Sequence, residues 1–320
     1  MKQGKCSVVA YGDAVLDIIL YPRRGLIGES VFVDEAYVSP GGAASNTAVG
    51  LSRLGVNACI LVSIGGDVVG RMIIEDFEKE RVDTSYVRVL SDQQTGLVVS
   101  IVLENGRKYL LSFRGASRMN TIDPELMESV LANAKLLYVS GYVFDNIDGG
   151  ESVVKLVKAA YHYNILVYLE LGGFPFEERK DIIPHLRGFV NFLSLSLDDL
   201  GSLTPFSNVE ESLNYVYSLI KPGYIFLKLG KQGSLVFNGV EYRYVKPCSV
   251  ELVDPTGCGD AFNAGVIYAL LNNYKPLEAA RVGNAMGGFK AMGKGARYLP
   301  RSIDELKSFM QDKCSYISLE

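Results

Sequence analysis

From about residue 115 onward, short apolar runs alternate with longer segments of helical spacing. Strands are predicted near Leu136–Val139, Leu166–Leu169, Val190–Leu193 and Tyr224–Leu229, and helices near Gly150–Tyr163, Phe176–Leu186 and Val209–Ile220. Strands that alternate with helices of about 10–15 residues are joined by right-handed crossovers and form a mostly parallel sheet. The alternation therefore predicts an α/β fold of three layers, with a doubly wound parallel sheet between two layers of helices.

The first third of the chain adds two extended stretches to elements of this kind. A strand is predicted at Val8–Tyr11, a helix over Gly42–Leu54, a strand at Ala58–Ile64 and a helix over Val68–Lys79. Residues 15–40 and 93–114 instead hold only extended runs: Ile18–Tyr21, Ser30–Val38, Thr95–Leu103 and Lys108–Phe113. Asn105-Gly106 joins the last two runs, and Asn-Gly between apolar runs is a strong hairpin signal. We expect residues 15–40 and 93–114 to pair into a small separate sheet, a lid over one edge of the main sheet.

Composition describes an ordinary globular chain and disfavours several classes of function. The 320 residues are 48% hydrophobic and 21% charged, and no linker or repeat divides them, so a single domain over residues 1–320 is expected. A net charge of −4 argues against nucleic acid and anionic membranes as partners, and no apolar run approaches the roughly 20 residues that span a bilayer. Five scattered cysteines without a C-x-x-C spacing, beside only two histidines, disfavour a structural zinc site. A reduced, cytoplasmic setting is expected.

The segment Asp254-Pro255-Thr256-Gly257-Cys258-Gly259-Asp260 combines an anion-binding turn with a carboxylate. The proline and the glycines shape a tight turn, and the apolar run Ala261–Leu271 continues it as a helix. The free N–H groups of residues 257–260 at such a helix start can converge on an anion. A carboxylate there does not help to anchor an anion, but it can take the proton of an attacking hydroxyl in phosphoryl transfer. The competing interpretation is an ordinary N-cap aspartate after a glycine-rich turn.

A second glycine-rich segment opens a helix near the N-terminus. It reads Pro40-Gly41-Gly42-Ala43-Ala44-Ser45-Asn46 and is followed by Leu51-Ser52-Arg53-Leu54-Gly55. The glycines permit a close approach of the backbone, and Asn46 offers both a donor and an acceptor to a polyol.

With these two segments, the chain resembles the ribokinase-like (PfkB) family of carbohydrate kinases. G-G-x-x-x-N…L-x-x-L-G near the N-terminus and D-x-T-G-x-G-D near the C-terminus are the family's two signatures, and both occur here in the expected order. Further matches are Gly12-Asp13…Asp17, Gly65-Gly66-Asp67-Val68-Val69-Gly70, Lys228-Leu229-Gly230-Lys231-Gln232-Gly233, Asn284 and Lys294-Gly295-Ala296. The resemblance implies a ribokinase-like fold with a small β-sheet lid. It also implies ATP- and Mg²⁺-dependent phosphorylation of a hydroxymethyl group on a sugar or a sugar-like small molecule.

The resemblance implies a role for each matching residue. Asp260 is the expected base, and Gly257, Cys258 and Gly259 are the expected anion hole. The acceptor-binding positions are Asp13, Asp17, Gly41, Gly42 and Asn46, and the nucleotide-binding positions are Lys228, Gly230, Gly233 and Asn284. Arg114, at the end of a lid strand, is a candidate contact for an acidic or phosphorylated acceptor, and a solvated arginine is the equal alternative.

Three features depart from the family pattern or are left open. Ser196-Leu197-Asp198-Asp199 stands where the family usually has N-x-x-E, so Asp199 is expected to serve the Mg²⁺ environment through waters. Cys258 replaces the usual alanine, and its place at a helix N-terminus favours the thiolate, although nothing nearby in sequence suggests covalent catalysis. A requirement for a monovalent cation such as K⁺ and a homodimer through the lid are left open.

Residues 288–295 only partly match a Walker A motif, and three alternative functions are considered. Residues 288–295 nearly spell a Walker A loop but lack its Ser or Thr, and they are interpreted as a helix cap and a nucleotide-edge loop. A nucleoside kinase would need an aromatic slot in the lid, and a phosphosugar kinase would need extra cations. The candidates are Tyr21, Phe32, Tyr37 and Tyr109 for the slot, and Arg23, Arg24 and Arg114 for the cations. A catalytically silent sensor of the same fold is disfavoured by the intact Asp260 and its glycines.

Overall fold

The computed structural model describes residues 6–22, 31–103, 108–132, 134–176 and 178–314, and in these residues nine strands form the larger of two sheets. The strands are β1 (Val8–Tyr11), β4 (Ala58–Gly65), β5 (Asp83–Leu90), β8 (Leu136–Ser140), β9 (Leu166–Glu170), β10 (Phe192–Ser196), β11 (Tyr224–Lys228), β12 (Ser234–Phe237) and β13 (Tyr242–Val245). Their order is β13-β12-β11-β10-β9-β8-β1-β4-β5. Neighbours from β5 to β11 pair in parallel, and β12 and β13 pair antiparallel at one edge. The mostly parallel sheet is confirmed.

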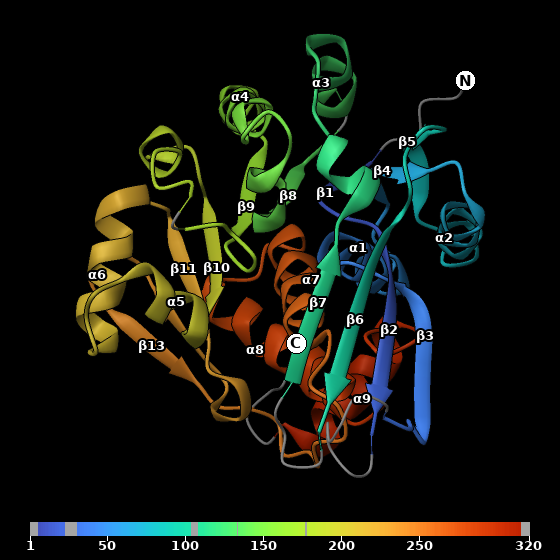
Figure 1. The fold of residues 1–320 in the computed structure, drawn as a ribbon. Helices are drawn as coiled ribbons and strands as arrows, with labels where there is room; N and C mark the ends of the chain where they lie inside the picture. Colours follow the sequence, from blue (N-terminus) through green and yellow to red (C-terminus); the bar gives the residue numbers. More distant parts are fainter. Residues whose placement is uncertain (1–5, 23–30, 104–107, 133, 177, 315–320) are drawn as a thin grey trace.

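Helices cover both faces of this sheet (Figure 1). They are α1 (Ala43–Arg53), α2 (Val68–Lys79), α3 (Pro124–Leu131), α4 (Glu151–His162), α5 (Leu197–Leu203), α6 (Val209–Ile220), α7 (Cys258–Leu271), α8 (Pro276–Ala291) and α9 (Ile303–Lys313). Successive strand residues point to opposite faces. In β1, Val8 and Ala10 join the core beneath α1, α2, α7, α8 and α9, whereas Val9 and Tyr11 join the core beneath α3, α4 and α6. Within the described ranges, no helix has both the length and the apolar composition needed to cross a membrane.

Four strands form a second, separate sheet, as expected from the two extended stretches. They are β2 (Val15–Tyr21), β3 (Glu35–Gly41), β6 (Gly96–Val102) and β7 (Lys108–Phe113), in the order β3-β2-β6-β7. Figure 1 shows them side by side in front of α7 and α8. The register places Asp17 of β2 opposite Ser39 of β3 and Val98 of β6. The predicted hairpin turn at residues 104–107, and Arg23 and Arg24, lie outside the described residues.

The glycine-rich start of α2 ties the main sheet to this second sheet. Asp67 caps α2 by accepting from the N–H of Gly70 at 2.8 Å. The same carboxylate accepts from the N–H and the hydroxyl of Thr95, at 2.8 and 2.7 Å, just before β6 begins. The Gly65-Gly66-Asp67 segment, which matches the family pattern, therefore holds the start of β6 against the start of α2.

The helix predicted over Phe176–Leu186 is wrong. Within the described part of this segment the backbone makes turns, and only η3 (Ile183–Leu186) is helical, as a short 3₁₀ turn. Pro184 lacks an N–H, and within an α-helix its ring would clash with the carbonyl four residues earlier. Apolar spacing predicted the helix, and the proline prevents it.

Four of the five cysteines are paired, contrary to the expectation of a fully reduced chain. Disulfides join Cys6 to Cys59 and Cys248 to Cys314, and Cys258 is the free cysteine. The pairs fasten the segment before β1 to β4, and the C-cap of α9 to the segment that follows β13. Both bonds bridge residues far apart in sequence, so spacing alone gave no sign of them.

Candidate active site

The parallel strands of the main sheet deliver polar side chains to one edge. Asp13 follows β1, Glu170 ends β9, Ser196 ends β10 and Lys228 ends β11. Because parallel strands have their carboxyl ends at the same edge, these residues are neighbours in space, where ligands bind in folds of this kind. The N-terminal turns of α1 and α7 reach the same region, and they carry Asn46 and Asp260.

The turn before α7 is held by Asp254. Its carboxylate accepts from the N–H groups of Thr256 at 2.8 Å and Gly295 at 2.9 Å, and from the Tyr21 hydroxyl at 3.1 Å. Burial opposes the charge, but the hydrogen bonds from Thr256 and Gly295 lower the pKa of Asp254 below its usual value. Gly257 sits at φ +79°, and a Cβ there would lie 2.5 Å from the Ala296 carbonyl oxygen. Only glycine fits this point of the turn.

The amides at the start of α7 divide into two groups. The N–H of Cys258 donates to the Pro255 carbonyl at 3.2 Å, inside the turn. Within the described chain, the N–H groups of Gly257, Gly259 and Asp260 have no such partner, as is usual for the first turn of a helix. These three amides are the available anion donors. Burial raises the pKa of the Cys258 thiol to about 11, so the expectation of a favoured thiolate is wrong.

Asp260 is a carboxylate with an elevated pKa. Its Oδ2 accepts from Asn46 Nδ2 at 2.8 Å. Burial and the charge of Glu170 raise the pKa of Asp260 to about 7, against the opposing effects of the Asn46 hydrogen bond and the Lys228 ammonium. A carboxyl group with a pKa near the working pH is suited to proton transfer.

Glu170 and Lys228 form a buried ion pair behind Asp260. Lys228 Nζ lies 2.6 Å from Glu170 Oε1, and the Tyr138 hydroxyl donates to the other oxygen. Burial disfavours both charges, but the attraction between them lowers the pKa of Glu170 and raises that of Lys228. A Cβ on Gly259 would lie 3.4 Å from Lys228 Nζ, so the ammonium lies beside the turn that starts α7.

The two glycines before α1 make room for groups of the chain itself. A Cβ on Gly41 would lie 1.9 Å from Asp17 Oδ2, and a Cβ on Gly42, at φ +100°, would lie 2.4 Å from the Asp13 carbonyl oxygen. The glycines thus let the acidic side chain of β2 and the segment after β1 pack directly against the helix start.

Arg114 is tightly partnered by Asp13. Its Nε and Nη2 donate to the two Asp13 oxygens at 2.7 Å each, and Nη2 also donates to Asn146 at 2.9 Å. Nη1 lies 3.3 Å from the Asp145 carboxylate. Asp13 and Arg114 therefore hold each other in place, and Asp145 balances the remaining positive charge.

A cavity of about 310 Å³ lies between the second sheet and the main sheet, and it brings seven of the predicted residues together. These are Asp13, Asp17, Gly42, Asn46, Asp199, Gly257 and Asp260. Besides Asp17, the second sheet contributes Val15, Val98, Ser100, Leu110 and Ser112, and the rest of the wall is Ala43, Tyr142, Glu170, Gly172, Gly173 and Thr256. Acidic, amide and hydroxyl groups from both sheets thus line the cavity together with apolar side chains of the second sheet.

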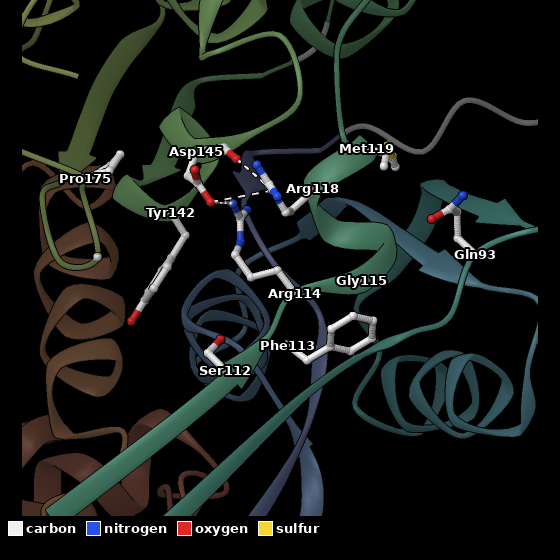
Figure 2. A pocket seen from close by; sticks show the side chains of 11 residues that line it. Gln93, Ser112, Phe113, Arg114, Gly115, Arg118, Met119, Tyr142, Asp145 and Pro175 are labelled. Carbon is white, nitrogen blue, oxygen red and sulfur yellow. Dashed lines mark hydrogen bonds and ion pairs between the residues drawn. The ribbon is translucent and has the colours of Figure 1, made fainter. Parts of the chain in front are cut away.

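A second cavity of about 590 Å³ adjoins the first and shares Ser112, Tyr142 and Gly173 with it. Arg114 lines this second cavity rather than the first. Figure 2 shows Arg114 and Arg118 pointing toward Asp145. Both guanidinium groups are therefore already engaged with a carboxylate of the chain.

Asp199 lines the first cavity from the start of α5. Its Oδ2 accepts from the N–H of Ser196 at 2.7 Å and from the Ser196 hydroxyl at 2.6 Å, while the Asp199 N–H donates to the same hydroxyl. Ser196 and Asp199 thus form a capping box that orients the acid.

The predicted nucleotide-binding residues divide into two places. Gly230, Gly233 and Asn284 gather near the end of β13, where Asn284 Nδ2 donates to the carbonyls of Val245 and Lys246 at 3.1 and 2.9 Å. A Cβ on Gly233 would lie 2.2 Å from the Val245 carbonyl oxygen. Lys228 belongs instead to the ion pair with Glu170.

Three residues in contact with the site were missed from the sequence: Glu170, Tyr138 and Arg297, whose Nε donates to Asn46 Oδ1 at 3.0 Å. Glu170 could have been found, because it is an acid directly after the predicted buried strand Leu166–Leu169, at the edge where the other site residues lie. Tyr138 lies within a buried strand, and Arg297 follows the matched Lys294-Gly295-Ala296 by one position. Neither carries a local signal of its contact.

Comparisons with known proteins agree with this geometry. The family model described as pfkB family carbohydrate kinase matches residues 5–302. An ATP-dependent 6-phosphofructokinase of Thermoanaerobacterium thermosaccharolyticum is 25% identical over 95% of this chain and 94% of its own length. A 2-dehydro-3-deoxygluconokinase of Bacillus subtilis is 25% identical over 96% of each chain.

The fold also matches solved structures. Arabidopsis thaliana ribokinase, complexed with ribose and ATP, superposes with a TM-score of 0.81 at 22% identity, over 96% of this chain and 99% of its own. The likeness supports the ribokinase-like fold, and the family match over nearly the whole chain supports the chemistry. The chain therefore belongs to the pfkB family of carbohydrate kinases, phosphotransferases whose acceptor is an alcohol group.

Proposed function

We propose that this kinase transfers the γ-phosphoryl group of ATP to a hydroxymethyl oxygen of a sugar or sugar-like alcohol bound in the 310 Å³ cavity. The observation that carries the proposal is Asp260, a carboxyl group with a pKa raised to about 7, at a helix start that faces acidic and amide groups. Asp13 and Asp17 would accept hydrogen bonds from the hydroxyls of the acceptor, and the Asn46 amide could also donate to them. Gly41 and Gly42 shape the backbone that carries them.

In the proposed reaction, Asp260 takes the proton of the attacking hydroxyl. A bond forms between that oxygen and the γ-phosphorus, the bond from the γ-phosphorus to the bridging oxygen breaks, and ADP leaves. The amides of Gly257, Gly259 and Asp260 would stabilise negative charge on the transferred group, aided by the positive end of α7. Lys228, close to Gly259, adds a positive charge at the same place.

The donor and its metal are also proposals. Asp199 lines the cavity with a carboxylate, the ligand type that Mg²⁺ prefers directly or through water. Bound Mg²⁺ would neutralise the phosphates. Gly230, Gly233 and Asn284 are proposed to shape the nucleotide side, with Asn284 acting by holding the end of β13.

The proposed reaction does not include a monovalent cation such as K⁺. At the base of the turn, the carbonyl oxygens of Asp254 and Gly293 accept from the Lys290 ammonium at 2.8 and 3.0 Å, and Lys290 is fully buried. The chain thus supplies a positive charge of its own at this place.

The described residues offer no contact that favours a nucleoside or a phosphosugar as the acceptor. The aromatic candidates for a base slot do not line the 310 Å³ cavity, and Tyr21 is engaged with Asp254. Arg114 is neutralised by Asp13 and Asp145, and Arg23 and Arg24 lie outside the described residues. We therefore propose a neutral sugar or polyol as the acceptor. We also propose that the reaction takes place in the cytoplasm, where ATP is available.

Replacing Asp260 by Asn tests the proposal. Loss of the base should reduce kcat by about 10²- to 10⁴-fold, while the KM for ATP stays near that of the unchanged protein. ATP turnover is measured first over a panel of sugars, polyols, sugar acids, phosphosugars and nucleosides, and the variant is then assayed with the best acceptor. Turnover retained in D260N would exclude Asp260 as the base. No turnover with any acceptor, together with tight ligand binding, would favour a sensor.

We propose, in addition, that two lids pair in a homodimer. β3 and β7 are the edge strands of the second sheet, and Val38, Leu111 and Phe113 on them are 51%, 58% and 50% exposed. Unpaired edges with apolar side chains favour association between copies. Leu111→Glu should convert a dimer into a monomer in light scattering, whereas Leu252→Glu, at an exposed site outside the sheet, should not. A monomeric unchanged protein would contradict the lid dimer.

A further inference from the structure

Arg297 contacts the amide that holds the proposed base. Its side chain is 9% exposed, its Nε donates to Asn46 Oδ1 at 3.0 Å, and its Nη1 pairs with Asp76 of α2. The other end of the Asn46 amide, Nδ2, donates to Asp260 Oδ2 at 2.8 Å. A continuous chain of contacts therefore runs from Asp76 through Arg297 and Asn46 to Asp260.

This chain of contacts fixes which way the Asn46 amide points. A flipped amide would place its oxygen against the Asp260 carboxylate and its NH₂ against the Arg297 guanidinium, and both contacts would be repulsive. With Arg297 donating to the oxygen, the NH₂ group is directed toward Asp260. Without Arg297, only the Asp260 carboxylate would oppose rotation of the amide.

A role in stabilising the fold does not by itself explain why an arginine occupies position 297. Its Nη2 is buried and has no hydrogen-bond partner in the described part of the chain. A buried donor without a partner destabilises the fold. The loop is also held by another residue, because Arg53 pairs with Glu80 and donates to the carbonyls of Arg297 and Leu299 at 3.3 and 3.2 Å.

We propose that Arg297 is a positioning residue of the kinase, which orients the Asn46 amide so that it donates to the Asp260 carboxylate. This role rests on the proposed function of Asp260 as the base. A hydrogen bond to the charged form favours that form, so Arg297 keeps a larger share of Asp260 ionised at neutral pH. The residue acts through Asn46 and does not itself line the 310 Å³ cavity.

The first test compares Arg297→Met with Arg53→Met. The methionine at 297 keeps much of the side-chain volume but donates nothing, so the acid limb of the pH profile of kcat/KM should move to higher pH. At pH 7 the loss should be about tenfold or more, the value of a hydrogen bond to a charged group. Arg53→Met removes a loop anchor of the same kind without touching the Asn46 side chain, and its acid limb should stay in place even where its Tm falls. Arg297→Lys, which retains one donor, should recover part of the loss.

A double variant separates the proposed role from a structural one. If Arg297 acts through Asn46, then adding Arg297→Met to Asn46→Ala should leave the acid limb of the single Asn46→Ala variant unchanged. A further shift in the double variant would overturn the proposal. So would an unchanged acid limb in folded Arg297→Met, or the same shift in Arg53→Met.

A second readout does not need turnover. In ¹⁵N-labelled protein, the side-chain NH₂ signals of Asn46, assigned through the Asn46→Ala variant, should move in Arg297→Met and stay in Arg53→Met. Signals that stay in Arg297→Met would overturn the contact. If the unchanged protein phosphorylates no acceptor, the proposed function fails, and the NH₂ signals still decide whether Arg297 orients Asn46.

Discussion

Four neighbouring side chains set the charge state of Asp260. The negative charges of Glu170 and Asp17 oppose its ionisation, whereas the hydrogen bond from Asn46 and the Lys228 ammonium favour it. Because burial also raises the pKa of Asp260, its carboxyl group is half ionised near pH 7 rather than near pH 4. If Asp260 is the base, as proposed, the free enzyme should gain activity as the pH rises toward about 7, because only the ionised carboxylate can take a proton.

Replacing Glu170 by Gln should move this limb to lower pH. The variant removes a negative charge that raises the pKa of Asp260 and leaves the Lys228 ammonium without its counter-charge, and both changes favour the Asp260 carboxylate. The pH profile of kcat/KM measures the shift, and Glu151→Gln on the exposed face of α4 serves as the control. A limb that stays in place or moves to higher pH would contradict this account of Asp260.

At the scale of elements, the helices α1 and α7 must lie close together, because they carry Asn46 and Asp260. They meet at Gly50, where a Cβ would lie 2.8 Å from the Cβ of Ala264. Such a contact is shorter than real side chains show, so a larger residue has to push the helices apart. The small residues at this crossing therefore serve the hydrogen bond between the two helix starts.

Gly50→Ala should thus reduce both stability and activity. Overpacking of a tight core costs about 1–3 kcal/mol, and separation of the helices should lengthen the contact between Asn46 and Asp260 and lower kcat. Chemical denaturation and steady-state kinetics measure the two effects. Gly201→Ala in α5 is the matched control, because a Cβ there meets nothing within 4 Å. Equal behaviour of the two variants would show that the crossing tolerates the added methyl group.

At the scale of the whole molecule, two disulfides fasten the described ends of the chain. Cys6 joins Cys59 across 53 residues and Cys248 joins Cys314 across 66. Bonds that close long loops restrict the unfolded chain and typically stabilise a protein by about 2–4 kcal/mol. Disulfides are rare in cytosolic proteins except in hyperthermophiles, so the two pairs do not support the cytoplasmic setting proposed above.

The variant that combines Cys248→Ala with Cys314→Ala should lower the free energy of unfolding by about 2–4 kcal/mol. Unfolding in denaturant without reductant measures this difference. Thiol titration of the denatured, unreduced protein should detect Cys258 as the one reactive thiol among the five cysteines. Five reactive thiols before reduction would contradict both bonds.

The amino-acid sequence by itself determined the fold class and seven of the eighteen residues that line the 310 Å³ cavity. The strand and helix periods predicted the parallel sheet because each element must bury one face, and the ranges of α2 and α6 agree with their predictions. The two glycine-rich motifs identified Asp260 and Asn46 because tight turns and helix starts leave local signals. Only the tertiary structure decided what surrounds them. Glu170, Arg297, the engagement of Arg114 by Asp13 and the pairing of the cysteines depend on contacts between distant segments, and charge, burial and distance at such contacts are set by packing, which leaves no periodic pattern in the chain.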